Sequence, residues 1–348
     1  MAVWRSLFGV GVLVAALIAT PGVATACACG GLLSTDPAVR VTDEMALLHT
    51  DGDTETVVMR LNLSSTADNA ALVIPTPAPA TVDAAPAEVF DELAELSAPR
   101  VEPVRKWVIG WGGAAAPEGS AGAAAGAPGA AGPTVLSQVR LGPLEATTLS
   151  GGDLDGLRKW LADNGYQLRP EISAGLQPYL REGWSVVAMR LTSQQPLAGP
   201  LAPVTLTFAS DELVYPMRMS AQAQRPQTVV IYTLGEHRMQ RADPDALSQY
   251  VDVDYAGDIA GRTDDPMLTE LAGRGAFLTR TTTSIVEPAA ITSDFRFAPA
   301  ATDEPFQRVV YDYEYLNLTL PILAGMLAVA VAAVVVLIRW VRRRTRAP

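Results

Sequence analysis

An uncharged run near the C-terminus restricts the fold of this chain more than any other feature. Leu318 to Ile338 comprises 21 residues without a charged side chain. A helix rises about 1.5 Å per residue, so this run is roughly 31 Å long as a helix, which matches the hydrocarbon core of a bilayer. We therefore predict a transmembrane helix over 318–338, with the lipid bilayer as its partner.

The residues on either side of this run orient the predicted span. Tyrosines precede the run and Trp340 follows it, as is typical of aromatic residues at membrane interfaces. The last ten residues, 339–348, contain five arginines, and a basic flank of this kind stays on the cytoplasmic side. We expect a single-pass cell-membrane protein with its N-terminal domain outside and a basic cytoplasmic tail over 339–348.

The N-terminus has the pattern of a secretory signal. Arg5 precedes an uncharged run of 13 residues, Leu7 to Ala19, which is too short to span a bilayer comfortably. Ala24-Thr25-Ala26 then fits the small-x-small cleavage rule. We predict a signal peptide over 1–26, cleaved between Ala26 and Cys27. An uncleaved N-terminal anchor is the alternative.

Composition limits what the exported region can be. The whole chain is 49% hydrophobic, which excludes a wholly disordered protein, and two cysteines exclude a disulfide-dense scaffold. Between the predicted signal and the span there are 37 acidic and 20 basic residues, a net charge of about -17. Nucleic-acid binding needs clustered positive charge, so we expect no nucleic-acid partner.

A low-complexity segment divides the exported region. Of the 24 residues in 110–133, 21 are Gly, Ala or Pro, and such a stretch cannot bury enough surface to offset its ordering entropy. We interpret it as a flexible linker between a first half, 27–109, and a second half, 134–286. Three prolines and many polar residues indicate a stalk over 287–317. Whether the two halves form one domain or two stays open.

Strands outnumber helices in the pattern and do not alternate with them regularly, which favours a β-rich α+β fold with a few helices. Helices are expected at 86–97 and 153–164, and a hairpin turn at Asp51-Gly52-Asp53. Strands are expected at 44–49, 56–63, 70–74, 135–139, 145–149, 184–191, 204–209, 228–234 and 276–285. The segments VVMRL at 57–61 and VAMRL at 187–191 look alike, so an internal duplication stays open.

An ordered set of short motifs suggests a family. Cys29 to Gly31 is followed by VIPTP at 73–77 and VFD at 89–91, then by LRKWLADNGY at 157–166, ELVYPM at 212–217 and FLTR at 277–280. In this order the motifs resemble a bacterial secreted family catalogued as domain of unknown function 2330, over roughly 27 to 310. The resemblance implies an exported envelope domain in bacteria. It implies no activity, fold or catalytic residues.

The search for catalytic motifs is negative. The sequence has no Gly-x-Ser-x-Gly elbow, His-Glu-x-x-His, P-loop or dinucleotide fingerprint. His49 and His237 are the two histidines, and either could act as a general base, but no nucleophile pattern accompanies them. Structural histidines are therefore the favoured interpretation. We assign no catalytic residue and no cofactor.

Cys27 and Cys29 are the most unusual pair in the sequence. Export favours a disulfide, within the chain or between chains, and a bridge across one residue would be strained and easily reduced. The alternatives are a redox-active pair, metal binding and lipidation of Cys27. Two thiolates fill only half a tetrahedral metal site, and Ala24-Thr25-Ala26 is an imperfect lipoprotein signal. A structural disulfide is favoured.

Acidic residues concentrate in a short stretch, which raises the question of calcium. Its members are Asp243, Asp245, Asp252, Asp254, Asp258, Asp264 and Asp265. Calcium needs several oxygen ligands at close spacing, but the order here does not match an EF-hand. A solvated acidic surface is favoured, and we predict no metal site.

Two functions of different classes remain. The first is a non-catalytic envelope module that binds a wall component, another envelope protein or a small ligand. The second is an envelope enzyme, either a thiol–disulfide protein using Cys27 and Cys29 or a hydrolase using scattered carboxylates. The first is favoured because no nucleophile–base arrangement is found.

Overall fold

The computed structural model describes residues 25–27, 30–34, 36, 39–108, 137–141, 144–149, 154–223 and 225–344. Within this part of the chain strands outnumber helices, and the predicted α+β fold is confirmed. All of the predicted linker, 110–133, and the predicted signal peptide up to residue 24 lie outside the described residues.

The first sheet has six strands, in the order β1-β2-β5-β10-β9-β8, and every neighbouring pair is antiparallel. Val187 of β10 lies opposite Ile74 of β5 and Thr148 of β9. The strands are β1 (Thr25–Cys27), β2 (Gly30–Leu33), β5 (Asn69–Thr76), β8 (Ser137–Leu141), β9 (Leu144–Leu149) and β10 (Ser185–Thr192).

The second sheet has nine strands, in the order β19-β16-β17-β14-β3-β4-β12-β6, with β11 also paired to β4. Its one parallel pair among the described strands joins β3 and β14, in which Leu234 lies opposite His49. The strands are β3 (Arg40–Thr50), β4 (Thr54–Ser64), β6 (Thr81–Ala84), β11 (Ala198–Pro200), β12 (Val204–Ala209), β14 (Gln227–Gly235), β16 (Tyr250–Asp258), β17 (Phe277–Ile285) and β19 (Phe306–Gln307).

Smaller elements complete the described part of the domain. Three short strands form a sheet in the order β13-β18-β15, namely β13 (Leu213–Tyr215), β15 (Met239–Arg241) and β18 (Phe295–Pro299). The helices are α1 (Val89–Leu96), α2 (Leu154–Asp163), α3 (Pro170–Arg181) and α4 (Pro266–Ala272), with 3-10 turns η1 (Arg218–Gln222), η2 (Pro244–Leu247) and η3 (Pro288–Ala290).

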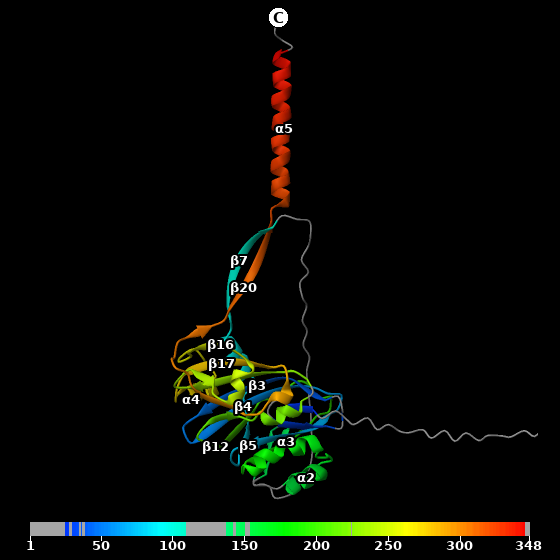
Figure 1. Ribbon diagram of the computed structural model, residues 1–348, viewed down its shortest axis with the longest axis vertical. Coiled ribbons are helices and arrows are strands. Elements are labelled where there is room, and N and C mark those ends of the chain that lie inside the picture. The colour runs from blue at the N-terminus through cyan, green and yellow to red at the C-terminus, as the bar shows by residue number, and fades with distance from the viewer. Residues whose placement is uncertain are drawn as a thin grey trace, which may run out of the picture.

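The two large sheets pack face to face, and helices cover their outer faces. Strand side chains alternate between faces, so Met59 of β4 enters the core between the sheets, while Val58 faces the outer core with Phe90 of α1. Ala188 of β10 likewise joins Trp160 of α2 in a third core. The result is a helix–sheet–sheet–helix arrangement, with α2 and α3 at the end of the molecule farthest from the C-terminal helix (Figure 1).

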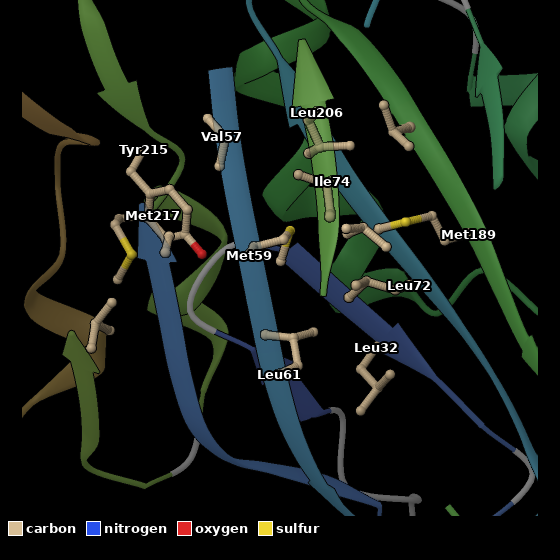
Figure 2. Close-up of a cluster of buried hydrophobic side chains, with 14 of the residues drawn as sticks. Leu32, Val57, Met59, Leu61, Leu72, Ile74, Met189, Leu206, Tyr215 and Met217 are labelled. Atoms are coloured by element: carbon tan, nitrogen blue, oxygen red, sulfur yellow. The ribbon is translucent and has the colours of Figure 1, made fainter. Parts of the chain in front are cut away.

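Figure 2 shows the core between the sheets. Met59 and Leu61 of β4 gather with Leu72 of β5 and Met189 of β10, and all four are at most 3% exposed. The two similar segments, 57–61 and 187–191, therefore lie in different sheets and contribute to the same core.

Strands from both sides of the 110–133 segment alternate within the same sheets. β4 pairs with β12, and β5 pairs with β10, so both halves contribute to one sandwich. The region assigned to a stalk, 287–317, begins inside this sandwich. Phe295 of β18 is fully buried, and only the strand from Val309 onward leaves the domain (Figure 1).

A two-stranded ribbon joins the domain to the C-terminal helix. β7 (Arg100–Val108) runs parallel to β20 (Val309–Asn317), and α5 (Thr319–Arg344) follows directly (Figure 1). Within α5, Thr319–Arg342 is 24 residues long and apolar enough to cross a membrane. Thr319 is buried, and the described side chains from Leu320 onward are exposed.

Candidate functional site

A groove of about 900 Å³ opens at one edge of the nine-stranded sheet. The tip of the β3–β4 hairpin forms one wall, and the turn after β14 together with the ends of β15 and β18 forms another. The loop at Asp211 and Glu212, which precedes β13, completes the rim. The groove is therefore built from segments far apart in the sequence, on both sides of residues 110–133.

The parallel pairing of β3 and β14 places two of these walls together. Parallel neighbours end at the same sheet edge, so the hairpin after β3 and the turn after β14 lie side by side. The hairpin was predicted from Asp51-Gly52-Asp53, and the structure confirms it: Gly52 has a φ of 107°, which favours glycine. The backbone amide of Thr54 donates to Asp51 Oδ1 over 3.2 Å, which closes the turn.

His49 lies near the end of β3 and has a structural role. Its side chain is buried, and Nδ1 donates to the carbonyl of Leu234, 2.9 Å away on β14. The bond fixes Nδ1 as the protonated nitrogen and reinforces the pair of strands beside the groove. His49 is not among the described residues that line the groove.

His237 lines the groove and is bonded to an aspartate. Nδ1 lies 2.9 Å from Asp303 Oδ2, and the amide of Arg238 donates to the other oxygen of Asp303 over 2.8 Å. The hydrogen bond to Asp303, followed by its negative charge, raises the pKa of His237. The bond from His237, together with the Arg238 amide, lowers the pKa of Asp303. Both side chains are about half exposed.

Carboxylates outnumber basic groups around the groove. Arg274 pairs with Asp51 at 3.4 Å, and Arg296 pairs with Glu212, so both lining arginines are already neutralised. A further two carboxylates, Asp211 and Glu236, also line the groove, and neither forms an ion pair within the described chain.

The inner surface of the groove is apolar. Leu213, Leu234 and Phe297 contribute to it and are at most 7% exposed, so they present only a small part of their surface to solvent. An apolar floor under an anionic rim favours a ligand that carries a cation on an apolar body. Among the described residues that line the groove, Thr50 is the one with a hydroxyl or thiol group, and its Oγ1 accepts from the Gly52 amide over 3.1 Å.

A buried glutamate near this rim was not found from the sequence. Glu55 of β4 is 0% exposed, and the amide of Val214 donates to its Oε1 over 3.0 Å. Its Oε2 has no hydrogen-bond partner in the described part of the chain. Burial raises the pKa of Glu55 well above its ordinary value. The hydrogen bond from Val214 lowers this pKa, and the negative charge of Glu212 raises it further. Glu55 is thus a candidate for a carboxyl group that is neutral in the folded protein.

The acidic stretch from 243 to 265 is not a single surface. Asp243 pairs with Arg241 in the interior, and Asp245 accepts from the amides of Thr292 and Ser293 over 2.8 and 3.0 Å. Other members serve strands, turns or caps. Asp254 pairs with Arg308, Asp258 accepts from Ala260, and Asp265 caps α4 through the amide of Leu268. Among the described residues no group of three or more His, Cys, Asp or Glu could hold a metal ion.

The Cys27 and Cys29 region is only partly described. The backbone of Thr25–Cys27 forms β1, with Ala26 opposite Gly31 and Cys27 opposite Gly30. Cys29 and the side chain of Cys27 lie outside the described residues. Bridging, lipidation and redox roles of this pair, and cleavage between Ala26 and Cys27, stay predictions. Cleavage at that bond would remove two of the three paired residues of β1.

Close packing explains the two glycines that follow Cys29. A Cβ on Gly30 would lie 2.2 Å from the carbonyl oxygen of Val73, and one on Gly31 would lie 2.7 Å from the side chain of Ile172. At Gly30, β2 therefore approaches the backbone of β5 more closely than any other residue type allows, whereas a side chain at Gly31 would have to displace the side chain of Ile172. This part of the motif serves packing.

These features define the class as a β-sandwich with an open groove, linked by a ribbon to one apolar C-terminal helix. The chain belongs to the family described as an uncharacterized protein conserved in bacteria, domain of unknown function 2330, whose model matches residues 23–298. The resemblance drawn from the sequence motifs is confirmed.

Other comparisons yield little. No curated protein matches the chain. Among solved structures, baculovirus P35 is similar at 8% identity, covering 76% of this chain and 98% of that chain, with a TM-score of 0.35. A mutated baculovirus P35 after caspase cleavage is 8% identical, covering 73% of this chain and 99% of that chain, with a TM-score of 0.34. Likeness at this level transfers neither fold nor function.

Proposed function

We propose that this protein is a membrane-tethered, exported module of the bacterial envelope that binds a ligand in the groove without catalysing a reaction. The observation that carries the proposal is the groove itself, with its apolar floor and two unpaired carboxylates, Asp211 and Glu236. Concave, mostly apolar sites with a few placed polar groups are the usual form of a ligand site.

The tether is supported by the surface of α5. The apolar side chains of this helix are exposed to solvent from Leu320 onward. An exposed apolar surface of this size is strongly unfavourable in water and favourable in hydrocarbon. The arginines after Ile338 favour a cytoplasmic tail, so the domain would lie outside.

The charge around the groove suggests what class of ligand it takes. Asp211 and Glu236 add two negative charges that no lining arginine compensates, so a cation is favoured at the rim. Leu213 and Phe297 offer apolar contact below. A basic, partly apolar peptide segment of another envelope protein satisfies both conditions.

A binding experiment with a defined probe tests this proposal. A fluorescein-labelled peptide of alternating lysine and leucine is titrated into the full chain in detergent, and its fluorescence polarisation is measured. We expect saturable binding that weakens as salt is raised, because exposed charges are screened. The same peptide with glutamate in place of lysine should not bind.

Paired variants locate the binding site. Asp211→Asn together with Glu236→Gln should lower the affinity for the lysine peptide about tenfold, since each exposed ion pair contributes up to about 1 kcal/mol. Asp264→Asn removes an exposed carboxylate outside the groove and should change nothing. The proposed ligand class would be overturned if the natural protein showed no saturable binding. It would also be overturned if the double variant and Asp264→Asn lost affinity equally.

A hydrolase is the second candidate, and one observation favours it. His237 is oriented by Asp303 at the groove, as a general base must be oriented by a second group. The one hydroxyl side chain of the described lining, Thr50, is hydrogen-bonded to the Gly52 amide within the hairpin turn. The nucleophile of this candidate would therefore be a water molecule. Hydrolysis of a bound peptide by the natural protein, and its loss in His237→Ala, would favour this candidate over simple binding.

The thiol–disulfide alternative rests on Cys27 and Cys29 alone. The double change Cys27→Ser and Cys29→Ser removes both sulfurs. If the free energy of unfolding and the cellular phenotype are unchanged, this alternative fails. If thiol–disulfide exchange by the natural protein disappears in the double variant, it gains support.

A further inference from the structure

We propose that the tip of the ribbon formed by β7 and β20 is a second membrane contact, in which Trp107 enters the lipid headgroup layer beside the start of α5. This inference rests on the proposed membrane tether, but it adds a contact from a strand some 200 positions earlier in the sequence than the span. Its partner is a lipid surface.

The register of the ribbon sets the height of Trp107. β7 and β20 pair in parallel over nine residues, with Trp107 opposite Leu316 and Val108 opposite Asn317. α5 begins at Thr319, so Trp107 is level with a residue three positions before the helix. At about 3.3 Å per residue this places Trp107 within about 10 Å of the first turn of α5.

The headgroup layer is the environment found at that height. It adds about 5–8 Å to each side of the hydrocarbon core. If the core begins at Leu318, as the uncharged run indicates, Leu316 and the neighbouring Trp107 are about 7 Å from its edge. Trp and Tyr are enriched at this level of membrane proteins because one end of the ring is apolar and the other can hydrogen-bond.

The surface of the ribbon tip is suited to this environment. Trp107 is 64% exposed and Tyr315 is 57% exposed. Residues opposite each other in a parallel pair point to the same side, so Trp107 with Leu316 faces one way and Tyr315 with Lys106 faces the other. Both faces of the tip therefore present large side chains that nothing in the described domain covers.

The charged side chains nearest the tip each contact another side chain of the ribbon. Arg105 bonds Glu314 at 3.0 Å, and Lys106 lies over the ring of Tyr313, 3.8 Å from its centroid. The last pairs, Trp107–Leu316 and Val108–Asn317, carry no charge. Entry of these last two pairs into the headgroup layer therefore carries no charged side chain into it.

A second contact has a mechanical consequence. A domain held by one helix through a single strand could rotate about that strand. Two strands joined over nine residues form a spacer of about 30 Å, and contacts from both strands at the membrane restrict its tilt. The groove would then be held at a defined height and direction above the bilayer.

Tryptophan quenching by brominated lipid tests this contact. The full chain is reconstituted into vesicles of phosphatidylcholine and phosphatidylglycerol, with or without lipids brominated near the headgroup end of their acyl chains. All proteins carry Trp4→Phe and Trp111→Phe, and Trp160 and Trp184 of the domain give the common background. One protein adds Trp340→Phe and so reports Trp107. A second adds Trp107→Phe and so reports Trp340, which follows the span at its cytoplasmic end.

We expect both reporters to lose emission in brominated vesicles, and the variant lacking both Trp107 and Trp340 to lose none. As a matched control, Val101→Trp in that last variant places a tryptophan at the domain end of the same ribbon, where it should stay unquenched. Quenching of Trp340 without quenching of Trp107 overturns the second contact and leaves the tether intact. Quenching of neither overturns the tether as well.

Discussion

Arg241 and Asp243 form a bidentate ion pair inside the domain. Arg241 Nε lies 2.7 Å from Asp243 Oδ1, and Nη2 lies 2.5 Å from Oδ2. Their side chains are 1% and 0% exposed. The guanidinium also lies 3.5 Å from the centroid of the Phe295 ring. The pair therefore joins β15 to β18 next to the groove. Asp243 belongs to the acidic stretch for which the sequence predicted a solvated surface.

Removing one partner of this pair should be severe. Asp243→Ala leaves a buried guanidinium without its carboxylate, and we expect the free energy of unfolding to fall by about 3–5 kcal/mol. Asp264→Ala removes an exposed carboxylate of the same stretch and should cost less than about 0.5 kcal/mol. Urea unfolding of both proteins measures the difference. Equal losses would show that the buried pair contributes nothing particular.

Glu55 should make stability depend on pH in an unusual direction. Its pKa is raised by burial, so the folded state retains a proton that the unfolded chain releases. Its contribution to stability is therefore present below the unfolded pKa of about 4.3 and is lost as pH rises toward the folded pKa. Glu55→Gln, which is neutral at every pH, should stabilise the protein at pH 7 relative to pH 4.

The control for Glu55 is a carboxylate without this burial. Asp53 lies in the exposed hairpin turn, and Asp53→Asn should change the free energy of unfolding at pH 7 by less than about 0.5 kcal/mol. If Glu55→Gln changes the free energy of unfolding equally at pH 4 and pH 7, the pKa of Glu55 does not differ between the folded and unfolded states and the argument is wrong.

His237 and Asp303 should titrate as a linked pair. The raised pKa of His237 means that its contribution to stability is complete below the unfolded value of about 6.5 and is lost as pH rises through the folded pKa. The lowered pKa of Asp303 means that its contribution is present above about 3.9 and is lost as pH falls through the folded pKa. The pair is thus strongest between these two limits.

Nuclear magnetic resonance of the imidazole measures this directly. In the natural protein the pKa of His237 should lie above its ordinary value, and in Asp303→Asn it should return toward that value. Glu236→Gln removes a weaker influence and should have a smaller effect. An unchanged His237 titration in Asp303→Asn would mean that the observed 2.9 Å bond does not govern this group.

Gly30 should tolerate no side chain. Its added Cβ would lie 2.2 Å from a backbone oxygen of β5, which can move only if the strand moves. Gly30→Ala is therefore expected to cost at least about 1–3 kcal/mol, in the range of overpacked cores. Gly235→Ala, where nothing lies within 4 Å of the new Cβ, is the matched control in the same fold. Thermal unfolding of the two variants should separate them clearly.

Local patterns predicted much of the fold. The turn at Asp51-Gly52-Asp53, the strand at 204–209 and the helix at 153–164 all depend on neighbouring residues, and all occur in the structure. The strand and the helix each bury one face, so their apolar residues recur at the spacing of a strand or a helix.

Other elements were hidden by composition. α3 was missed because Gly175 and Pro178 interrupt its helical pattern, yet Ile172 and Leu176 bury it against the first sheet. β16 was interpreted as an acidic surface because Asp252 and Asp254 alternate with the apolar residues of an outer strand of the sheet.

The groove could not be assembled from the sequence. His237 was recognised as one of two histidines, but its partner Asp303 lies 66 positions away. The parallel pairing of β3 and β14 joins His49 to Leu234 across 185 positions, and no short motif specifies such a pair. Long-range strand pairing depends on how whole strands are buried together. A local sequence pattern does not show which distant strand will be the partner.

Sidedness of labelling tests most directly whether the groove-bearing domain is displayed outside the membrane. In the Cys27→Ser and Cys29→Ser protein, a cysteine is introduced either as Leu247→Cys, at a side chain 96% exposed on the domain, or as Arg346→Cys in the basic tail. Intact bacterial cells are treated with a membrane-impermeant maleimide. We predict that Leu247→Cys is labelled in intact cells and that Arg346→Cys is labelled only after lysis. Labelling of Arg346→Cys in intact cells, or protection of Leu247→Cys until lysis, would contradict the proposed display of the domain.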